Sequence, residues 1–328
     1  MSSLKDSVLA LLEENGGFLS GQEISEKLDV SRTAVWKAIN QLKEQGFEIE
    51  AVRNKGYRVL SRPDIITEKE IRKYLVAGMS GSRLIVFDSI DSTNLEAKRR
   101  AEAGEEEGLL VTSDRQISGR GRRGRGWDSP PGTGIFMSLL LRPAIQPVNA
   151  SMITLVMALA VRKAINKLSG LEAVIKWPND IVCEGKKVCG ILTEMSLQED
   201  YISHIVIGAG INVNNESFPK EIEATASSLK LLGAQNVRRS ELIAEILNSF
   251  ELYYDKFLET EDLRGLKEEY NSYLVNAGRQ VKVIAASGDI TGIAKGIDDR
   301  GELIVETGDG SVHVNSGEVS VRGIYGYV

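Results

Sequence analysis

The feature that most constrains how this chain folds is a run of nine residues, 119–127, with the sequence GRGRRGRGW. Four arginines and four glycines precede a tryptophan, and neither a packed helix nor a packed strand accommodates that composition. Glycine N–H groups and guanidinium groups suit carboxylate or phosphate, so this arginine loop is predicted to bind an anion. It is expected to be mobile when empty and ordered around a negative ligand, on which Trp127 can stack.

A solvated arginine-glycine segment that touches RNA without specificity is the rival interpretation of this loop. The run occurs once, and apolar strand-like segments at 108–112 and 135–141 flank it. This context favours a ligand-binding loop held between two strands.

Length and charge limit the possible classes of protein. The 328 residues predict two or three domains, and the net charge of -6 excludes a basic coat for nucleic acid over the whole chain. Cys183 and Cys189 are too few and too close for a disulfide framework, which indicates a reducing compartment. The longest apolar run, 153–161, is too short to cross a membrane, and we expect a cytoplasmic protein.

The amino-terminal part of the chain has the pattern of a small helical domain. Apolar residues recur at helical spacing in three stretches: 4–14, 24–28 and 31–46. A capping box at 20–23 starts the second helix, and Ser31 can cap the third. Alternating residues on both sides of a turn at 54–56 then predict a hairpin. Two short helices about a tight turn, followed by a hairpin, predict a winged helix-turn-helix.

Charge is divided unevenly within this domain. Residues 1–30 carry two basic and six acidic side chains, whereas residues 31–58 carry six basic and three acidic side chains. The third helix and the hairpin therefore present the positive face, which predicts DNA binding. The predicted contacts are Ser31, Arg32, Thr33, Trp36, Lys37, Arg53 and Lys55. A three-helix protein-interaction module is the rival interpretation, and the low net basicity implies that DNA affinity requires a dimer.

A second domain is expected after a linker at 61–64. A strand at 84–87 leads into the motif DSTN, which begins an amphipathic helix. Asp91 or Ser92 can serve as the cap of this helix, and the hydroxyl and amide side chains of the motif can also bind a ligand, so the two interpretations are compatible. Gln116 offers a donor and an acceptor to a ligand amide, with an exposed surface glutamine as the alternative.

Charged groups follow a buried helix further along the chain. The segment 151–168 is almost continuously apolar and predicts a helix packed against a sheet. The next strand runs into KWPND, where Lys176 and Asp180 suit phosphate and magnesium. Lys187 then begins a strand at 188–195.

GAGIN at 208–212 contains two glycines that are expected to allow close approach of a ligand. It lacks the third glycine and the following helix of a dinucleotide fingerprint, which excludes a Rossmann site. Short alternating segments with regular glycines from residue 280 onward predict a small β-barrel. His204 and His313 lie far apart in sequence and predict neither a histidine metal site nor a histidine triad, so catalysis is expected to be mostly electrostatic.

Five motifs together resemble those of the bifunctional bacterial proteins that combine a biotin–protein ligase with a biotin operon repressor. They are DSTN at 91–94, Gln116 with the arginine loop, KWPND at 176–180, KVCGIL at 187–192 and GAGIN at 208–212. The resemblance covers essentially the whole chain. The winged helix separates this class from ligases that lack a DNA-binding domain.

The resemblance implies an α+β protein of three domains. These are an N-terminal winged helix-turn-helix at 1–62, a central mixed α/β catalytic domain of the biotin/lipoate ligase class at 63–275, and a small SH3-like β-barrel at 276–328.

The implied activity is that of an ATP-dependent biotin–[acetyl-CoA-carboxylase] ligase. The carboxylate of biotin attacks the α-phosphate of ATP to give biotinyl-5'-AMP, and a lysine of the biotin carboxyl carrier protein then displaces AMP. The implied catalytic residues are Lys187, Arg122, Asp180 and Lys176, with Asp180 also the ligand of Mg²⁺. The implied residues that bind biotin and ATP are Ser92, Thr93, Asn94, Gln116, Arg120, Gly121, Arg122, Trp127, Lys187, Gly190, Asn212 and Arg322.

The implied partners are operator DNA of biotin synthesis genes, carrier domains of acetyl-CoA carboxylase and other biotin-accepting carboxylases, and a second copy of the chain in a ligand-promoted homodimer. No membrane partner is expected. A repressor that only senses biotin, and a lipoate or octanoate ligase, are the alternatives. KWPND and Lys187 favour an enzyme over a sensor, and the GRGRRG sequence with the winged helix speaks against a lipoate ligase.

Overall fold

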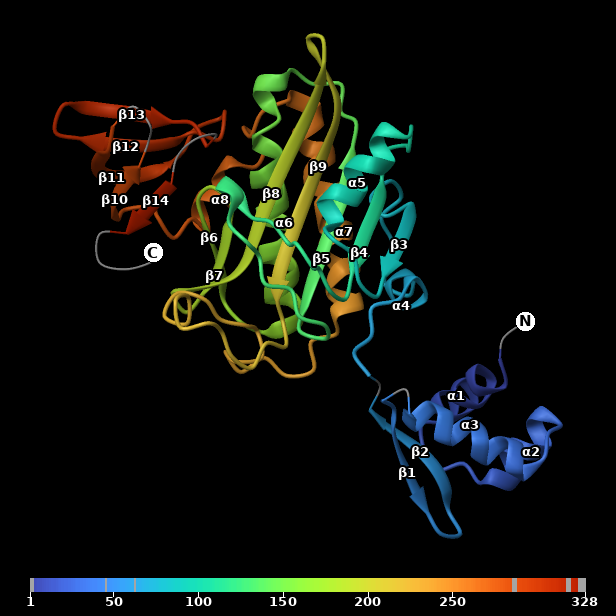
Figure 1. Cartoon of the computed structure of the whole chain (residues 1–328). Coiled ribbons are helices and arrows are strands. Elements are labelled where there is room, and N and C mark those ends of the chain that lie inside the picture. The colour runs from blue at the N-terminus through green and yellow to red at the C-terminus, as the bar shows by residue number, and fades with distance from the viewer. Residues whose placement is uncertain (1–2, 45, 62, 285–287, 317–319, 324–328) are drawn as a thin grey trace. The chain divides into compact units, whose positions relative to one another are not determined.

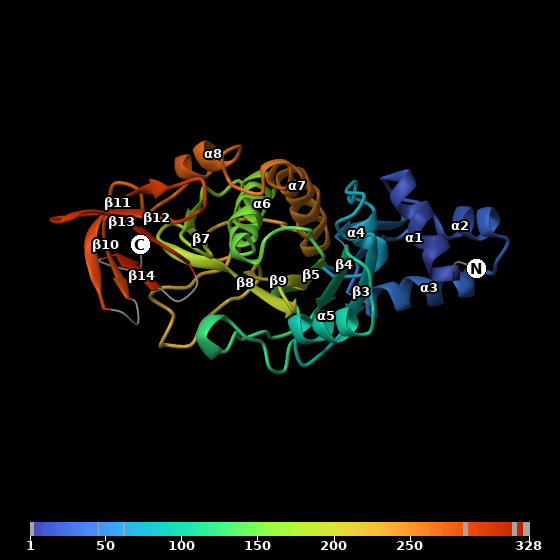
Figure 2. The ribbon, with the colours of Figure 1, turned by 90° about the horizontal axis from the view of Figure 1, so that it is seen from above.

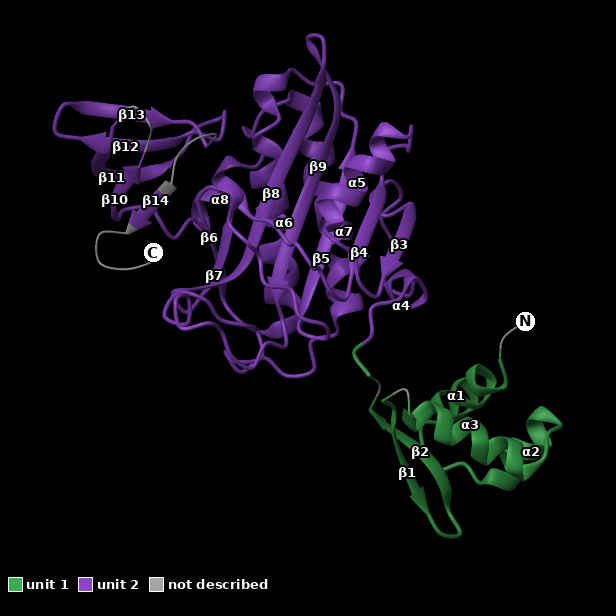
Figure 3. Ribbon diagram, viewed as in Figure 1, with its two compact units in different colours: residues 1–64 green, residues 65–328 purple. Residues whose placement is uncertain are grey.

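The computed structural model describes residues 3–44, 46–61, 63–284, 288–316 and 320–323. The chain divides into two compact units, Met1–Asp64 and Ile65–Val328 (Figure 3). Apart from residues 63 and 64, the predicted second and third domains both lie in the larger unit, and the division between them at 275 and 276 stays a prediction.

The described residues of the smaller unit form three helices and a two-stranded hairpin. They are α1 (Leu4–Asn15), α2 (Gly21–Leu28), α3 (Arg32–Glu44), β1 (Glu48–Val52) and β2 (Gly56–Ser61). Capping boxes start α1 and α2, so the first backbone donors of both helices are satisfied. The core of this unit consists of Val8, Leu12, Leu19, Ile24, Val35, Ala38, Ile39, Leu42 and Ile49. The predicted helix-turn-helix is confirmed.

Gly56 fixes the hairpin against the helices. Its φ is 105°, and a Cβ at this position would lie 2.1 Å from the carbonyl oxygen of Leu19. Backbone hydrogen bonds in both directions between Leu19 and Tyr57 depend on that close approach. Any side chain at residue 56 would therefore separate the hairpin from the helical core.

The larger unit is organised on a seven-stranded mixed sheet with the order β3-β4-β5-β9-β8-β7-β6 (Figure 1). Its strands are β3 (Arg83–Phe87), β4 (Leu109–Ser113), β5 (Gly134–Leu141), β6 (Ala173–Lys176), β7 (Asp180–Cys183), β8 (Lys186–Gln198) and β9 (Tyr201–Asn212). Only β3 and β4 pair in parallel. β8 and β9 are longer than the apolar pattern predicted, because their distal ends carry polar and charged residues around the turn at 199 and 200.

Helices cover both faces of this sheet (Figure 2). α6 (Met152–Ser169) and α7 (Arg239–Thr260) lie on one face, and α5 (Thr93–Glu102) packs on β4, β5 and β9 from the other. α4 (Glu68–Arg72) contacts α7 and β3. Among the described residues, one helical stretch, Pro147–Ser169, is long and apolar enough to cross a membrane. Its side chains are mostly buried within this fold, as predicted for a core helix.

The C-terminal part adds an antiparallel five-stranded sheet with the order β13-β12-β11-β10-β14. Its elements are α8 (Lys267–Ser272), β10 (Gln280–Ile284), β11 (Ile290–Ile297), β12 (Leu303–Thr307), β13 (Gly310–Val314) and β14 (Ser320–Gly323). The indole N–H of Trp177 donates to the carbonyl of Gly301, and both sheets share one apolar core. The predicted antiparallel β-structure is confirmed, whereas its closure into an SH3-like barrel stays a prediction.

Candidate functional site

A cavity of about 1120 Å³ brings together segments that are distant in sequence. Its walls come from the start of α5, the arginine loop, the turn between β6 and β7, the first half of β8, the end of β9, the loop that follows β9, and β14. Every residue that was predicted to touch ligand or Mg²⁺ lies in its lining: Ser92, Thr93, Asn94, Gln116, Arg120, Gly121, Arg122, Trp127, Lys176, Asp180, Lys187, Gly190, Asn212 and Arg322. Their individual roles remain predictions.

Uncharged polar groups form one end of the cavity. Ser92 occupies the N-cap position of α5, but its side chain makes no capping hydrogen bond. Thr93 donates through its backbone N–H and its hydroxyl to Oε1 of Gln116, at 2.9 and 3.1 Å. The amide of Gln116 in turn donates to Oγ of Ser129, at 3.2 Å. These groups therefore face the cavity in fixed orientations, as hydrogen-bonding partners for a polar, neutral part of a ligand.

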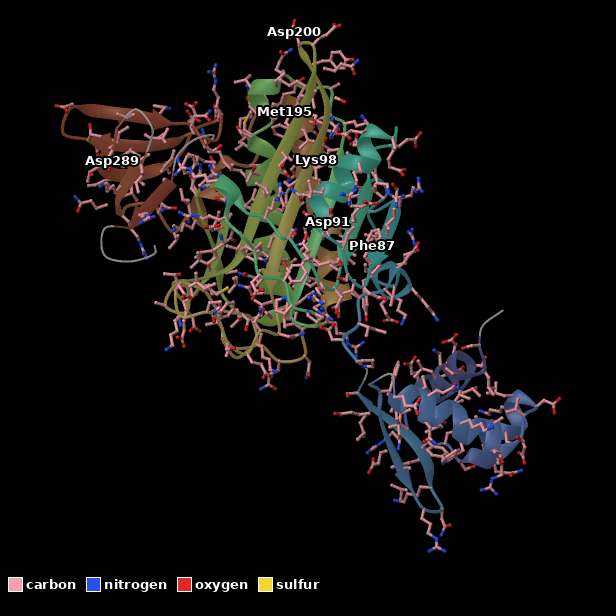
Figure 4. The ribbon with its side chains drawn as sticks, viewed as in Figure 1. Phe87, Asp91, Lys98, Met195, Asp200 and Asp289 are labelled. Atoms are coloured by element: carbon pink, nitrogen blue, oxygen red, sulfur yellow. The ribbon has the colours of Figure 1, made fainter. Side chains whose placement is uncertain are left out.

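Asp91, the first residue of the DSTN motif and labelled in Figure 4, is not among the residues of this wall. Its carboxylate accepts two hydrogen bonds from the guanidinium of Arg99, at 2.9 and 3.0 Å. This bidentate contact lowers the pKa of Asp91 to about 2. Asp91 therefore pairs with α5 and does not line the cavity.

The arginine loop forms a short hairpin over the cavity. Gly121 and Trp127 donate backbone hydrogen bonds to Arg125 and Gly119, and Arg123 adopts a left-handed φ of 56°. Arg122 is anchored from two sides, by Oδ1 of Asn179 at 3.1 Å and by the carbonyl of Ser316 at 2.6 Å. Sequence reasoning did not assign Asn179 a role, although the KWPND motif contains it.

Trp127 lies flat against the sheet where two strands carry glycine. A Cβ on Gly210 would lie 2.7 Å from the indole ring, and one on Gly190 would lie 3.0 Å from it. A Cβ on Gly208 would lie 2.1 Å from Oδ1 of Asn94. In this structure these glycines make room for Asn94 and Trp127, and both also line the cavity, so the expected close approach of a ligand stays a prediction. The lack of a side chain at 208 and 210 thus determines how closely Asn94 and Trp127 approach the sheet.

Positive charge concentrates at the other end of the cavity. Nζ of Lys187 lies 2.5 Å from Oδ1 of Asp180 and 5.4 Å from the centre of the Trp127 ring. Lys176 is 5% exposed, and burial lowers its pKa to about 8 against the opposing effect of Asp180. Burial also lowers the pKa of Arg122. Asp180 lies among several cations, an arrangement that suits a polyanion better than a free metal ion.

Two further predicted residues complete the lining. Asn212 is buried, and its side-chain amide donates to the carbonyl of Ser227 at 3.1 Å. Arg322 is exposed on β14, where it pairs in register with Lys282. Arg322 therefore brings a cation to the cavity from the C-terminal sheet, and the contact with the nucleotide that the resemblance implied stays a prediction.

Comparison with known proteins identifies the family. Family models match three parts of the chain. They are the models of the biotin/lipoate A/B protein ligase family over residues 86–212, of an HTH domain over 5–58, and of the biotin protein ligase C terminal domain over 277–322. The bifunctional ligase/repressor BirA of Bacillus subtilis (strain 168) is 40% identical across 98% of this chain and 99% of its own. The chain belongs to the bifunctional ligase/repressor family. The Escherichia coli (strain K12) member is 32% identical over 97% and 99% of the two chains.

A solved structure agrees with this placement in the ligase/repressor family. The biotin protein ligase from Aquifex aeolicus in complex with biotin and ATP has a TM-score of 0.65 and 32% identity, and it covers 74% of this chain and 99% of that chain. The resemblance that the motifs indicated is therefore confirmed.

The DNA-binding prediction concerns the smaller unit of this ligase/repressor. Its predicted residues are all exposed: Ser31, Arg32, Thr33, Trp36, Lys37, Arg53 and Lys55. Oγ of Ser31 accepts a hydrogen bond from the N–H of Ala34 at 3.2 Å, so this residue caps α3. Trp36 is 56% exposed, which is unusual for a tryptophan on a helix and agrees with a contact surface.

One of the two histidines has carboxylate neighbours. His313 on β13 lies 2.7 Å from a carboxylate oxygen of Asp298, and Glu302 is the third member of a group whose possible metal-ligating atoms lie within 4.8 Å of one another. Distance along the sequence gave no sign of this group, because strand pairing brings it together. His204 is buried on β9, which lowers its pKa.

Proposed function

We propose that the chain activates biotin with ATP as biotinyl-5'-AMP and transfers biotin to a lysine of the biotin carboxyl carrier protein of acetyl-CoA carboxylase and of other biotin-accepting carboxylases. The observation that carries this proposal is the polarity of the cavity. Its Thr93 and Gln116 end is neutral and hydrogen-bonding, whereas its Lys176 and Lys187 end is cationic. Biotin has a neutral ureido ring at one end and a carboxylate at the other, which matches this division.

The first step forms a bond between a carboxylate oxygen of biotin and the α-phosphorus of ATP. The bond between that phosphorus and the bridging oxygen breaks, and pyrophosphate leaves with the electron pair. No proton transfer is needed, so the protein contributes position and positive charge. Lys187 and Arg122 supply that charge, and Lys176 attracts the phosphates.

The second step is acyl transfer. The neutral amine of the acceptor lysine attacks the acyl carbon of the adenylate, AMP leaves with the electron pair of the acyl–oxygen bond, and the amine loses a proton. The acyl-phosphate is already activated, so a strong base in the protein is unnecessary. Trp127, whose indole N–H makes no hydrogen bond in the structure, is proposed to face adenine together with Asn212.

A magnesium ion is proposed to accompany ATP at Asp180. The carboxylate of Asp180 lines the cavity beside Lys187 and is mostly buried, so its donor chemistry suits Mg²⁺. Magnesium in proteins is commonly held by one or two carboxylates together with the phosphates of the substrate. When bound, the ion would neutralise charge on the phosphates.

Repression is proposed as the second activity, with biotinyl-5'-AMP as corepressor and the operator of biotin synthesis genes as target. The exposed basic surface of α3 and the hairpin supports a DNA contact. A single winged helix with few phosphate contacts binds DNA weakly, so we propose a homodimer that the adenylate promotes. The free, buried cysteines support a cytoplasmic location.

Two assays test the catalytic proposal. Biotin-dependent exchange between pyrophosphate and ATP reports the first step, and labelling of a purified carrier domain reports the second. Failure of exchange would contradict a ligase and leave a sensor. Exchange that proceeds equally well with octanoate in place of biotin would contradict the assigned substrate.

A further inference from the structure

A chain of buried hydrogen bonds continues from the neutral wall of the cavity to a charged residue outside it. Oγ of Ser138 on β5 lies 2.8 Å from Oγ1 of Thr93 and 2.6 Å from Oδ1 of Asn94. The amide nitrogen of Asn94 donates to a carboxylate oxygen of Glu194 on β8, at 2.7 Å. Glu194 does not line the cavity. It therefore acts on any ligand only through Asn94.

The chemistry of Glu194 fixes the orientation of the Asn94 side chain. An ionised carboxylate only accepts hydrogen bonds, so Asn94 must present its NH₂ group to Glu194. Its carbonyl oxygen Oδ1 then faces Ser138, whose hydroxyl proton it accepts. Oδ1 also lies over Gly208, a residue of the cavity lining, where a Cβ would be only 2.1 Å away.

This orientation determines what the cavity offers to a ligand. Oδ1 of Asn94 has a second lone pair. Ser138 gives its one proton to Asn94, so Oγ1 of Thr93 keeps its lone pairs as acceptors, with its own proton lying toward Gln116 or Ser138. The cavity wall therefore accepts hydrogen bonds at two adjacent positions. The ureido ring of biotin carries two N–H donors and needs such acceptors. A reversed Asn94 amide would place a donor against a donor.

We propose that Glu194 is a positioning residue that fixes Asn94 as a hydrogen-bond acceptor for the ureido N–H groups of biotin. This inference rests on the proposed function. The proposal can be tested because Glu194 has a second hydrogen-bond partner, Lys98. Nζ of Lys98, which Figure 4 labels on α5, lies 2.5 Å from the other carboxylate oxygen. Lys98 and Asn94 are both donors, and the two oxygens of Glu194 satisfy one each.

Replacing Glu194 with glutamine leaves one oxygen for two donors. The charged Lys98 makes the stronger hydrogen bond and takes that oxygen. The NH₂ group of the new glutamine then faces Asn94, so the Asn94 amide turns over and presents its oxygen to that group. We expect Glu194→Gln to raise the Kd for biotin about tenfold, the usual effect of leaving one buried donor unsatisfied. The kcat of pyrophosphate exchange at saturating biotin should change less than twofold, because the cationic end of the cavity is intact.

The double variant Glu194→Gln with Lys98→Met separates positioning from general structure. Without Lys98, the glutamine oxygen is free to accept from Asn94, and the Asn94 amide returns to its original direction. Biotin affinity should recover to within about threefold of the parent. If Glu194 only stabilises the fold through its ion pair, the second substitution cannot restore binding.

The experiment is calorimetric titration of the full chain with biotin, with thermal unfolding of each variant measured alongside. Glu245→Gln is the matched control, because Glu245 forms a single ion pair with Lys167 at 2.8 Å between α7 and α6. The inference about Glu194 would be overturned, with the proposed function unaffected, by an unchanged Kd for biotin in Glu194→Gln. It would also be overturned if the double variant bound biotin no more tightly than the single variant. A parent protein that does not bind biotin would overturn the proposed function and this inference with it.

Discussion

At the scale of single residues, the ammonium of Lys187 lies 2.5 Å from the carboxylate of Asp180 and also approaches the Trp127 ring. We expect Lys187→Met to lose adenylate formation while the protein stays folded. Removing one preorganised charge contact costs about 3 kcal/mol of transition-state stabilisation. Pyrophosphate exchange measures the effect. Lys186→Met, one residue earlier and outside the cavity lining, is the control and should retain full activity.

Lys176 gives a prediction about pH. Burial lowers the pKa of its ammonium to about 8, so the fraction that is neutral grows as the pH rises through 8. Phosphate favours the charged form, and ATP binding should therefore raise this pKa and take up a proton. ATP affinity should fall above pH 8 in the parent, and Lys176→Met should show a flatter profile. Calorimetry at pH 8.5 in two buffers of different ionisation enthalpy measures the uptake, and equal uptake in both proteins would contradict the assignment.

At the scale of elements, β8 and β9 hold Trp127 at a fixed depth by presenting glycines to it. Gly210→Ala places a methyl group 2.7 Å from the indole, so the ring has to move. We expect ATP affinity to fall more than biotin affinity, by about 1 to 3 kcal/mol if the base stacks on this ring. Separate titrations with each ligand decide this. Gly265→Ala, which meets no atom within 4 Å, is the control.

α3 gives a second prediction at this scale. Lys37 is exposed in the first half of the helix, and Lys43 lies in its last turn. If the start of α3 enters DNA, Lys37→Ala should weaken operator binding and reduce the slope of log affinity against log salt by about one. Binding isotherms at several salt concentrations measure both quantities. Lys43→Ala should keep the parent slope, and an equal loss in the two variants would argue against this docking.

At the scale of the whole molecule, the four arginines of the arginine loop make association with a second copy unfavourable until an anion neutralises them. Biotinyl-5'-AMP supplies that anion, so ligand binding, dimer formation and operator occupancy should be positively coupled, by about 1 to 3 kcal/mol. Sedimentation with and without adenylate, followed by operator binding under the same conditions, measures the coupling. Biotin alone should have a smaller effect, because it has no adenine to stack on Trp127. Unchanged mass and unchanged DNA affinity would together contradict the model.

The sequence by itself determined the local structure and the membership of the site. Serine and acidic residues three apart started α1 and α2, continuous apolarity marked α6 as a core helix, and the motifs named the cavity residues. These features are short-range, since capping and hydrophobic periodicity act within a few residues along the chain.

Only the tertiary structure decided how those residues act on one another. Glu194 is a charged residue on a strand whose pattern suggests exposure, yet it bonds to Asn94 across 100 residues of sequence. The glycines at 208 and 210 lie against Asn94 and Trp127, two neighbours that the sequence did not indicate. Strand register sets these contacts, because a shift of one residue would turn each side chain to the other face of the sheet. The alternation of residues along one strand does not specify which neighbours it meets.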